Sequence, residues 1–262
     1  MNCIAIANQK GGVGKTTTCI NLAAAIAATG KRVLLIDVDP QAHASNGLGV
    51  PEGASILTLS DLMMEQCSLE ETVRTTSQPG LFIIPAGQGL TGFEVNPPAG
   101  RESRYLLRRV IQGINKGWDF IFLDPPPALS LLTVNCLIAA GMLIIPVQAE
   151  YFALAGLVRM AQLVDMMREE HNPKLELMGV LLTMYDRRTR LAEDVEKELR
   201  NNFDGPVFKT VIPRSVRVAE APSYGMPVTQ YAPSSPAAQA YTALAQEFIG
   251  MMHAHHAAHH TD

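Results

Sequence analysis

The chain alternates between short apolar runs and longer stretches with helical spacing. The apolar runs are rich in β-branched residues and fall at positions 3–7, 32–37, 81–85, 120–124, 142–147, 177–183 and 207–212. Runs of this length, separated mostly by helical patterns, are typical of βαβ units. Residues 33–36 and 120–123 are apolar throughout, as expected of strands inside a parallel sheet that helices cover on both faces. The pattern predicts an α/β fold with a mainly parallel, twisted sheet.

Four segments carry clear helical signals, from apolar residues at three- and four-residue spacing or from a terminating glycine or proline. They are 16–29, 155–171, 191–203 and a last helix whose buried stripe is Tyr241, Leu244, Ala245 and Phe248. The stretch 87–101, with interspersed Gly, Pro and Asn, and the stretch 232–236 are predicted to be loops.

The composition fits one ordinary globular domain. The 262 residues are 47% hydrophobic and 18% charged, and the net charge of −4 argues against a surface that is basic throughout. We expect a single domain over residues 1–250, followed at 251–262 by a disordered tail rich in His and Ala. The longest apolar run is too short to span a membrane, and no signal peptide is visible, so we expect a cytoplasmic protein with no membrane partner.

The sharpest chemical signal lies between the first apolar run and the first helix. It is the segment Gln9-Lys10-Gly11-Gly12-Val13-Gly14-Lys15-Thr16-Thr17, in the strand, glycine loop and helix order of a phosphate-binding loop. All nine residues are candidate nucleotide-binding residues. Backbone N–H groups and the helix N-terminus would surround phosphate oxygens, Lys15 would neutralise the outer phosphates, and the Thr16 hydroxyl would reach Mg²⁺. Gln9 stands where the usual pattern has its first glycine, and Lys10 is an additional lysine.

Three aspartates mark the ends of two apolar runs. Asp37 and Asp39 belong to the second run and the residues after it, and Asp124 ends the fourth. Ligands of open α/β sheets collect at the carboxyl ends of the strands, so these carboxylates are expected near the phosphate loop. The guanine-reading N-K-x-D motif is absent, because the one Asn-Lys pair has its aspartate one place too late. We therefore expect ATP rather than GTP.

The sequence resembles the ParA/MinD superfamily of ATPases, whose deviant Walker A loop has the pattern K-G-G-x-G-K-[ST]. The resemblance covers residues 1–250 and is to the chromosomal ParA (Soj) branch, on segments 37–41, 131–135, 148–157, 182–186 and 220–225. It implies a P-loop NTPase-like fold and Mg²⁺-dependent hydrolysis of ATP to ADP and phosphate. The chain departs from the common pattern at Pro125, Ser130 and Ser215, where Cys, Gly and Asn are usual.

The resemblance also implies roles for the candidate residues. Lys10 would reach the phosphates of a partner subunit in a nucleotide-sandwich homodimer, and Lys10 and Lys15 are candidate catalytic residues with Asp39. Asp39 would orient or activate the hydrolytic water, while Asp37 and Asp124 would help hold the metal.

The family contacts adenine near an I-P-R-N segment. Here the matching residues are 212–215, so Pro213 and Ser215 are candidate base-binding residues.

The same branch implies ATP-dependent, sequence-nonspecific binding of double-stranded DNA. The candidate surface consists of Arg187, Arg188, Arg190 and Arg217. Such a patch would contact the phosphate backbone and weaken steeply with salt. A ParB-like centromere-binding partner would stimulate hydrolysis and release, which implies a nucleoid-associated location.

Two other functions stay open at this point. A ParA-like ATPase that positions another cargo, such as a chemoreceptor array or a microcompartment, would share the motifs. A metabolic P-loop enzyme of the dethiobiotin synthetase type would share the phosphate loop, although Lys10 and the arginine cluster argue against it. The sequence favours a DNA-partitioning ATPase.

Overall fold

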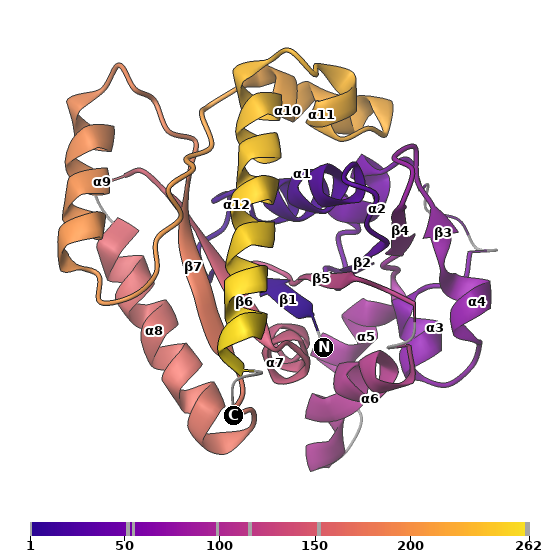
Figure 1. The fold of residues 1–262 in the computed structure, drawn as a ribbon. Coiled ribbons are helices and arrows are strands. Elements are labelled where there is room, and N and C mark those ends of the chain that lie inside the picture. Colours follow the sequence, from indigo (N-terminus) through magenta and orange to yellow (C-terminus); the bar gives the residue numbers. More distant parts are fainter. Residues whose placement is uncertain are drawn as a thin grey trace.

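A seven-stranded sheet lies at the centre of the molecule (Figure 1). The computed structural model describes residues 2–50, 53, 56–97, 100–114, 117–150 and 153–259. The strands are β1 (Cys3–Ile6), β2 (Val33–Asp37), β3 (Arg74–Thr75), β4 (Leu81–Ile84), β5 (Phe120–Asp124), β6 (Met142–Gln148) and β7 (Glu176–Thr183), in the order β3-β4-β2-β5-β1-β6-β7. Only β3, at one edge of this sheet, pairs antiparallel; the other pairings are parallel. The predicted α/β class with a mainly parallel sheet is confirmed.

Six of the seven apolar runs form strands, and the prediction for 207–212 is wrong. Phe208 N–H donates to Val180 O at 3.0 Å and Ile212 N–H donates to Leu182 O at 2.9 Å, so both ends of this segment touch β7. Between them, the N–H groups of Lys209 and Thr210 donate to the Glu247 carboxylate instead. Because that carboxylate takes the Thr210 N–H, which a continuing ladder would direct at β7, the segment stays irregular along the sheet edge.

The helices lie between and around the strands. Their bounds are α1 (Lys15–Ala27), α2 (His43–Gly47), α3 (Leu59–Met63), α4 (Leu69–Thr72), α5 (Gly89–Val95), η1 (Arg101–Tyr105), α6 (Leu106–Gly113), α7 (Leu131–Ala139), α8 (Ala153–Glu170), α9 (Arg190–Asn202), α10 (Val216–Glu220), η2 (Ala221–Tyr224), α11 (Val228–Tyr231) and α12 (Pro236–His259). The predicted loop 87–101 contains α5, which forms because Leu90 and Phe93 are buried one turn apart. In the described part of the chain, no helix combines the length and apolar character needed to cross a membrane.

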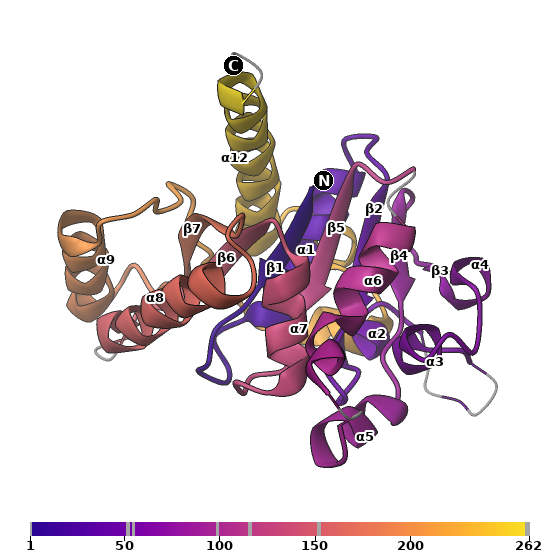
Figure 2. The ribbon, with the colours of Figure 1, turned by 90° about the horizontal axis from the view of Figure 1, so that it is seen from below.

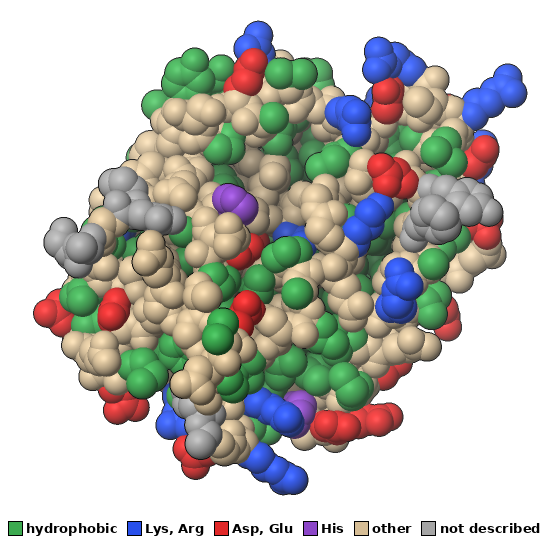
Figure 3. All heavy atoms as spheres, turned by 180° about the vertical axis from the view of Figure 1, so that it is seen from behind, with side chains coloured by type: hydrophobic (Ala, Val, Ile, Leu, Met, Phe, Trp, Pro, Cys, Tyr) green, Lys and Arg blue, Asp and Glu red, His purple; other side chains and the backbone are tan. Residues whose placement is uncertain are grey.

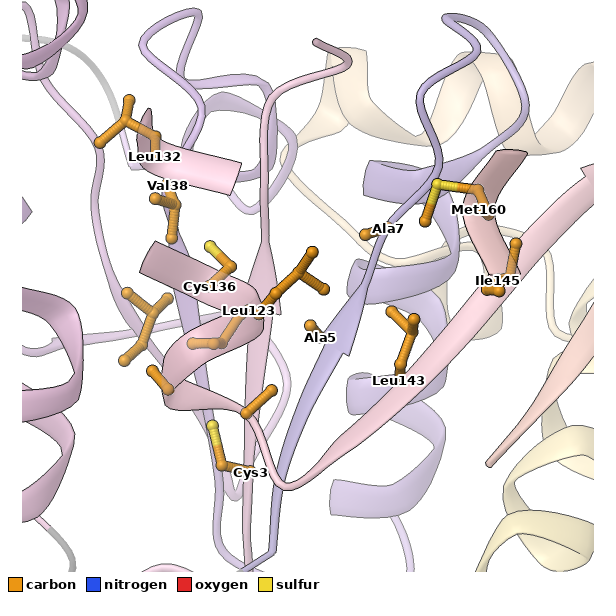
Figure 4. Close-up of a cluster of buried hydrophobic side chains, with 14 of the residues drawn as sticks. Cys3, Ala5, Ala7, Val38, Leu123, Leu132, Cys136, Leu143, Ile145 and Met160 are labelled. Carbon is orange, nitrogen blue, oxygen red and sulfur yellow. The ribbon is translucent and has the colours of Figure 1, made fainter. Parts of the chain in front are cut away.

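Each face of the sheet carries its own hydrophobic core. Alternate residues along β1 point to opposite faces: Ile4 and Ile6 pack with α1 and α12, whereas Cys3, Ala5 and Ala7 pack with α7 and α8. Figures 1 and 2 show helices on both sides of the sheet, and Figure 4 shows the small side chains of Cys3, Ala5 and Ala7 in the same cluster as Cys136 and Leu123. Small residues on this face of β1 let the covering helices approach the central strand closely.

The expected disordered tail is instead a continuation of the last helix. α12 runs through His259, so the prediction is wrong for residues 251–259, while 260–262 lie outside the described residues. Met252 is buried and extends the stripe of Tyr241 and Phe248 down the helix. His255 Nε2 also lies 2.8 Å from Glu176 Oε2 at the start of β7. These contacts hold the segment against the sheet in spite of its polar composition.

Candidate active site

The phosphate loop leaves the carboxyl end of β1 and runs directly into α1. β1 lies between β5 and β6, where chain connections depart to opposite sides, which is the place where open α/β sheets bind ligands. Gly12 (φ 74°) and Gly14 (φ 87°) adopt the left-handed conformation, and Gly14 is the N-cap of α1. A side chain would be strained at both positions, so these two glycines allow the loop to turn its backbone towards a ligand.

Two buried side chains fix the loop to the sheet. Thr183 Oγ1, at the end of β7, donates to Val13 O at 2.8 Å. Asn8 Nδ2 donates to Pro146 O at 2.8 Å, and Asn8 Oδ1 accepts the Lys10 N–H at 3.0 Å. The loop is therefore held at both ends by neighbouring strands before any ligand binds, which reduces the entropy cost of binding.

Lys15 lies in the first turn of α1 and is buried, with 6% of its surface exposed. Its Nζ donates to the backbone O of Lys10 at 3.2 Å, across the mouth of the loop. Burial lowers the pKa of Lys15, and the nearby carboxylates of Asp124 and Asp39 oppose that shift. A buried ammonium beside a glycine loop and a helix N-terminus favours an anionic ligand.

Asp124 is the most unusual group in the site. It is fully buried, and among the described residues neither of its carboxyl oxygens has a hydrogen-bond partner. Burial raises the pKa of Asp124 well above its usual range, and the charge of Asp37 raises it further. The Thr16 hydroxyl is close enough to oppose that shift, without forming a hydrogen bond of ordinary geometry. An unsatisfied carboxylate beside a hydroxyl fits a site for Mg²⁺, which prefers oxygen ligands.

Asp37 is equally buried, but both of its carboxylate oxygens accept hydrogen bonds. Its Oδ2 accepts from both the N–H and the hydroxyl of Ser45, at 2.8 and 2.7 Å, and its Oδ1 accepts the Asp39 N–H at 3.2 Å. Burial raises the pKa of Asp37 to about 6, against these hydrogen bonds. Asp37 thus also caps the first turn of α2. Asp39 is 6% exposed, and its Oδ1 accepts the Gln41 N–H at 2.9 Å.

The additional lysine points away from its own phosphate loop. Lys10 Nζ lies 2.7 Å from Glu150 Oε2, and both side chains are nearly half exposed. Gln9 beside it is half-buried, and Gly11 is exposed. An exposed ion pair of this kind contributes little stability, so Lys10 is free to exchange its partner for a stronger anion.

Pro213 and Ser215 lie beside the phosphate loop in space. Both line a cavity of about 380 Å³ together with Gly14 and Thr17, and Ile212 and Tyr241 supply apolar walls. Thr16 and Thr17 also line a neighbouring cavity with His43 and Asn46. The two cavities flank the first turn of α1, where a nucleotide bound at the phosphate loop would extend its base.

The candidate DNA-contacting arginines lie in two exposed groups. Arg187, Arg188 and Arg190 are on the β7–α9 connection and the start of α9, and Arg188 makes a bidentate pair with Asp186. Arg217 is on α10 and pairs with Glu220 at 2.8 Å. The two segments adjoin, because Arg214 N–H donates to Tyr185 O at 3.1 Å. Figure 3 shows Lys and Arg side chains gathered, with some acidic ones, at the upper right, where this connection lies.

Sequence reasoning missed three residues that hold the site together. They are Ser45 on Asp37, Thr183 on the phosphate loop and Glu150 on Lys10. Thr183 and Glu150 fall inside segments that carried the family resemblance, which is a signal that could have singled them out. Ser45 lies eight residues after Asp37 with no motif of its own, so its role depends on the turn between them.

The comparisons with known proteins agree with this geometry. A family model described as an AAA domain matches residues 1–177. The chain is 48% identical over 250 residues to the chromosome-partitioning ATPase Soj of Thermus thermophilus, covering 94% of each chain. It is 45% identical over 251 residues to the chromosome partitioning protein ParA of Caulobacter vibrioides, covering 95% of this chain and 94% of that one.

A solved structure adds a likeness in three dimensions. The septum site-determining protein MinD of Pyrococcus horikoshii, complexed with Mg-ADP, has a TM-score of 0.75 and 27% identity, covering 94% of this chain and 95% of that one. This likeness confirms the predicted P-loop NTPase-like arrangement of sheet and helices.

Proposed function

Because the chain belongs to the ParA/Soj family of chromosome-partitioning ATPases, we propose that it binds ATP with Mg²⁺ and couples ATP hydrolysis to DNA partitioning. The observation that carries the proposal is the combination of a preformed phosphate loop with the unsatisfied carboxylate of Asp124 beside it. Buried polar groups without partners are rare in folded proteins, and a cation bound to a triphosphate at the loop, or the water ligands of that cation, would satisfy this carboxylate.

The residues present suit Mg²⁺. Thr16, in the first turn of α1, and Asp124, at the end of β5, would hold the ion, with Asp37 at the end of the adjacent strand β2 beside them. When bound, the ion supplies charge neutralisation between the phosphate oxygens and this buried acidic pair. Lys15 would contact the outer phosphates from its position in the first turn of α1.

Asp39 is the proposed residue for the hydrolytic water. Its Oδ1 is oriented by the Gln41 N–H, and its backbone is tied to Asp37, so the carboxylate is held in place where its charge reaches Lys15 of the phosphate loop. A carboxylate in this position would orient a water molecule for in-line attack and accept its proton. The base would lie in the cavity lined by Pro213 and Ser215.

Lys10 would act on a second copy of the chain. Its ammonium group is exposed and directed to Glu150, which supports a role outside its own phosphate loop. In the proposed ATP-bound homodimer, Lys10 of each protomer contacts the phosphates of its partner's nucleotide. Two lysines repel each other near one site, so dimer closure would depend on the triphosphate charge between them.

The dimer would bind double-stranded DNA without sequence preference. The exposed arginines 187, 188 and 190, adjoined by the segment that carries Arg217, support contact with the phosphate backbone. We propose that a ParB-like centromere-binding protein stimulates hydrolysis and thereby releases the DNA, which would place the protein on the nucleoid.

Light scattering coupled to size-exclusion chromatography tests the proposal directly. We expect a monomer without nucleotide and with ADP, and a dimer with ATP when hydrolysis is blocked by Asp39→Ala. DNA retention should follow the dimer, and DNA should raise ATP turnover without any added metabolite. A monomer in every nucleotide state, or turnover that needs a small-molecule acceptor and ignores DNA, would contradict the proposal.

A further inference from the structure

Ser45 is placed to control Asp37, the carboxylate that ends β2, and through it Asp39, which follows the strand. Its hydroxyl donates to Asp37 Oδ2 at 2.7 Å and accepts the Ala86 N–H at 3.1 Å. The Ser45 N–H donates to the same Asp37 oxygen at 2.8 Å. Ser45 is 2% exposed and Asp37 is fully buried, so water cannot replace these bonds.

The Asp37 carboxylate in turn constrains the backbone of Asp39. Asp37 Oδ1 accepts the Asp39 N–H at 3.2 Å, while Ser45 fixes the other oxygen. A carboxylate is planar, so fixing Oδ2 also fixes the direction of Oδ1. The series of hydrogen bonds therefore runs from the Ala86 N–H, two residues after β4, through the Ser45 hydroxyl and Asp37, to the backbone of Asp39.

Asp124 differs from Asp37 in its hydrogen bonding. The described residues supply no hydrogen bond to the Asp124 carboxylate, which is therefore available for direct contact with a cation. Asp37 has donors on both oxygens, so its position is set by the protein before any cation arrives. Two carboxylates on paired strand positions thus differ in freedom, and Ser45 supplies both donors to one oxygen of Asp37.

We propose that Ser45 is a positioning residue that holds Asp37 in the orientation required at the Mg²⁺ site and, through Asp37, sets the backbone of Asp39. This inference rests on the proposed function, since it assigns Ser45 to the metal side of that same site. The side-chain hydrogen bonds described for Ser45 go to Asp37 and Ala86 rather than to the phosphate loop, so binding of nucleotide without metal should not depend on the hydroxyl.

Calorimetry with ADP as the probe separates these effects. Each variant is titrated with ADP in Mg²⁺ and again with ADP in excess EDTA. For Ser45→Ala we expect unchanged affinity in EDTA and loss of about tenfold of the affinity in Mg²⁺, with a raised Mg²⁺ requirement for ATP turnover. Ser45→Thr keeps the hydroxyl and should restore both. Should Ser45→Ala fail to fold, Ser45→Cys, a weak hydrogen-bond partner of similar size, is judged by the same criteria.

A double-mutant cycle with Asp37→Asn identifies the route. If Ser45 acts through Asp37, Ser45→Ala should add almost nothing to the Mg²⁺ effect of Asp37→Asn. Additive effects, an equal loss of affinity in EDTA, or an unchanged Mg²⁺ dependence would each overturn the role of Ser45 and leave the proposed function standing. Wild-type protein that binds no adenine nucleotide would instead remove the proposed function and this role with it.

Discussion

Asp37 and Asp124 occupy paired positions on the adjacent strands β2 and β5, and both side chains are fully buried. Two like charges so placed repel each other in a region of low dielectric, and each loses its hydration. The site therefore stores an unfavourable interaction that a cation between the carboxylates would relieve.

Asp37→Asn should remove much of this repulsion, and the resulting gain in folding stability should depend on pH. The folded-state pKa of Asp37 is raised from 3.8 to about 6, so the folded protein holds this proton more tightly than the unfolded chain does. Stability from this group is complete below pH 4 and is lost as the pH rises through about 6. We measure the free energy of unfolding by denaturant, without nucleotide, for Asp37→Asn and wild type. The difference, variant minus wild type, should be more positive at pH 7.5 than at pH 4 by up to about 3 kcal/mol.

The exposed Asp165→Asn is the matched control for this experiment, because it removes the same charge from the surface of α8. Its stability relative to wild type should hardly change with pH. An Asp37→Asn difference that is equal at both pH values would show that the Asp37 proton is not linked to folding.

Substitutions of the two lysines of the phosphate loop should have different effects on nucleotide binding. Lys15→Ala removes the buried ammonium beside Asp124 and should abolish nucleotide binding in calorimetry. Lys10→Ala removes a side chain that contacts Glu150 rather than its own loop, so ADP should still bind the monomer with affinity close to wild type. ATP-dependent dimers should be absent in both variants. Loss of ADP binding in Lys10→Ala would show that Lys10 serves its own site.

The sequence predicted the fold and the chemical centre because both depend on local patterns. Fully apolar runs specify buried parallel strands, and the glycine loop between β1 and α1 specifies its own backbone shape. The failures came from tertiary contacts. Glu247 keeps the predicted strand at 207–212 irregular, and the burial of Met252 keeps the His-rich segment helical. A local sequence pattern does not reveal a tertiary contact with a residue far away in the chain.

For the candidate site residues, too, local patterns predicted the positions, whereas tertiary contacts were not predicted. Asp37 and Asp124 were expected near the loop because each ends a strand, and they lie there. The hydrogen bonds from Ser45 to Asp37 and from Thr183 to the phosphate loop were not foreseen, since these donors reach the site only when the strands are aligned. Strand ends can be read from periodicity, whereas hydrogen-bond geometry requires the sheet.

Arg188→Glu should separate DNA binding from dimerisation. Arg188 lies at the surface and pairs with Asp186, so a glutamate there repels both that neighbour and DNA phosphates. We expect ATP-dependent dimers of normal size whose DNA affinity, measured by fluorescence anisotropy, falls at every salt concentration. The slope of log affinity against log salt should decrease by about 2, for one lost phosphate contact in each protomer.

Lys174→Glu changes the net charge equally at an exposed position of the α8–β7 connection and is the matched control. Its salt slope should equal that of wild type. Equal losses in the two variants would mean that total charge, rather than the arginine surface, governs the affinity.

Thr183→Val should loosen the phosphate loop without changing any residue in it. The Thr183 hydroxyl donates to Val13 O at 2.8 Å in a buried position, and valine has nearly the same shape but no donor. The unsatisfied carbonyl should cost about 1–3 kcal/mol of unfolding free energy. Because the loop is then less well ordered before binding, ADP affinity should also fall, by roughly tenfold. Thr183→Ser, which keeps the donor, should retain ADP affinity despite losing a methyl group, and equal ADP affinities in the valine and serine variants would show that this hydrogen bond does not order the loop.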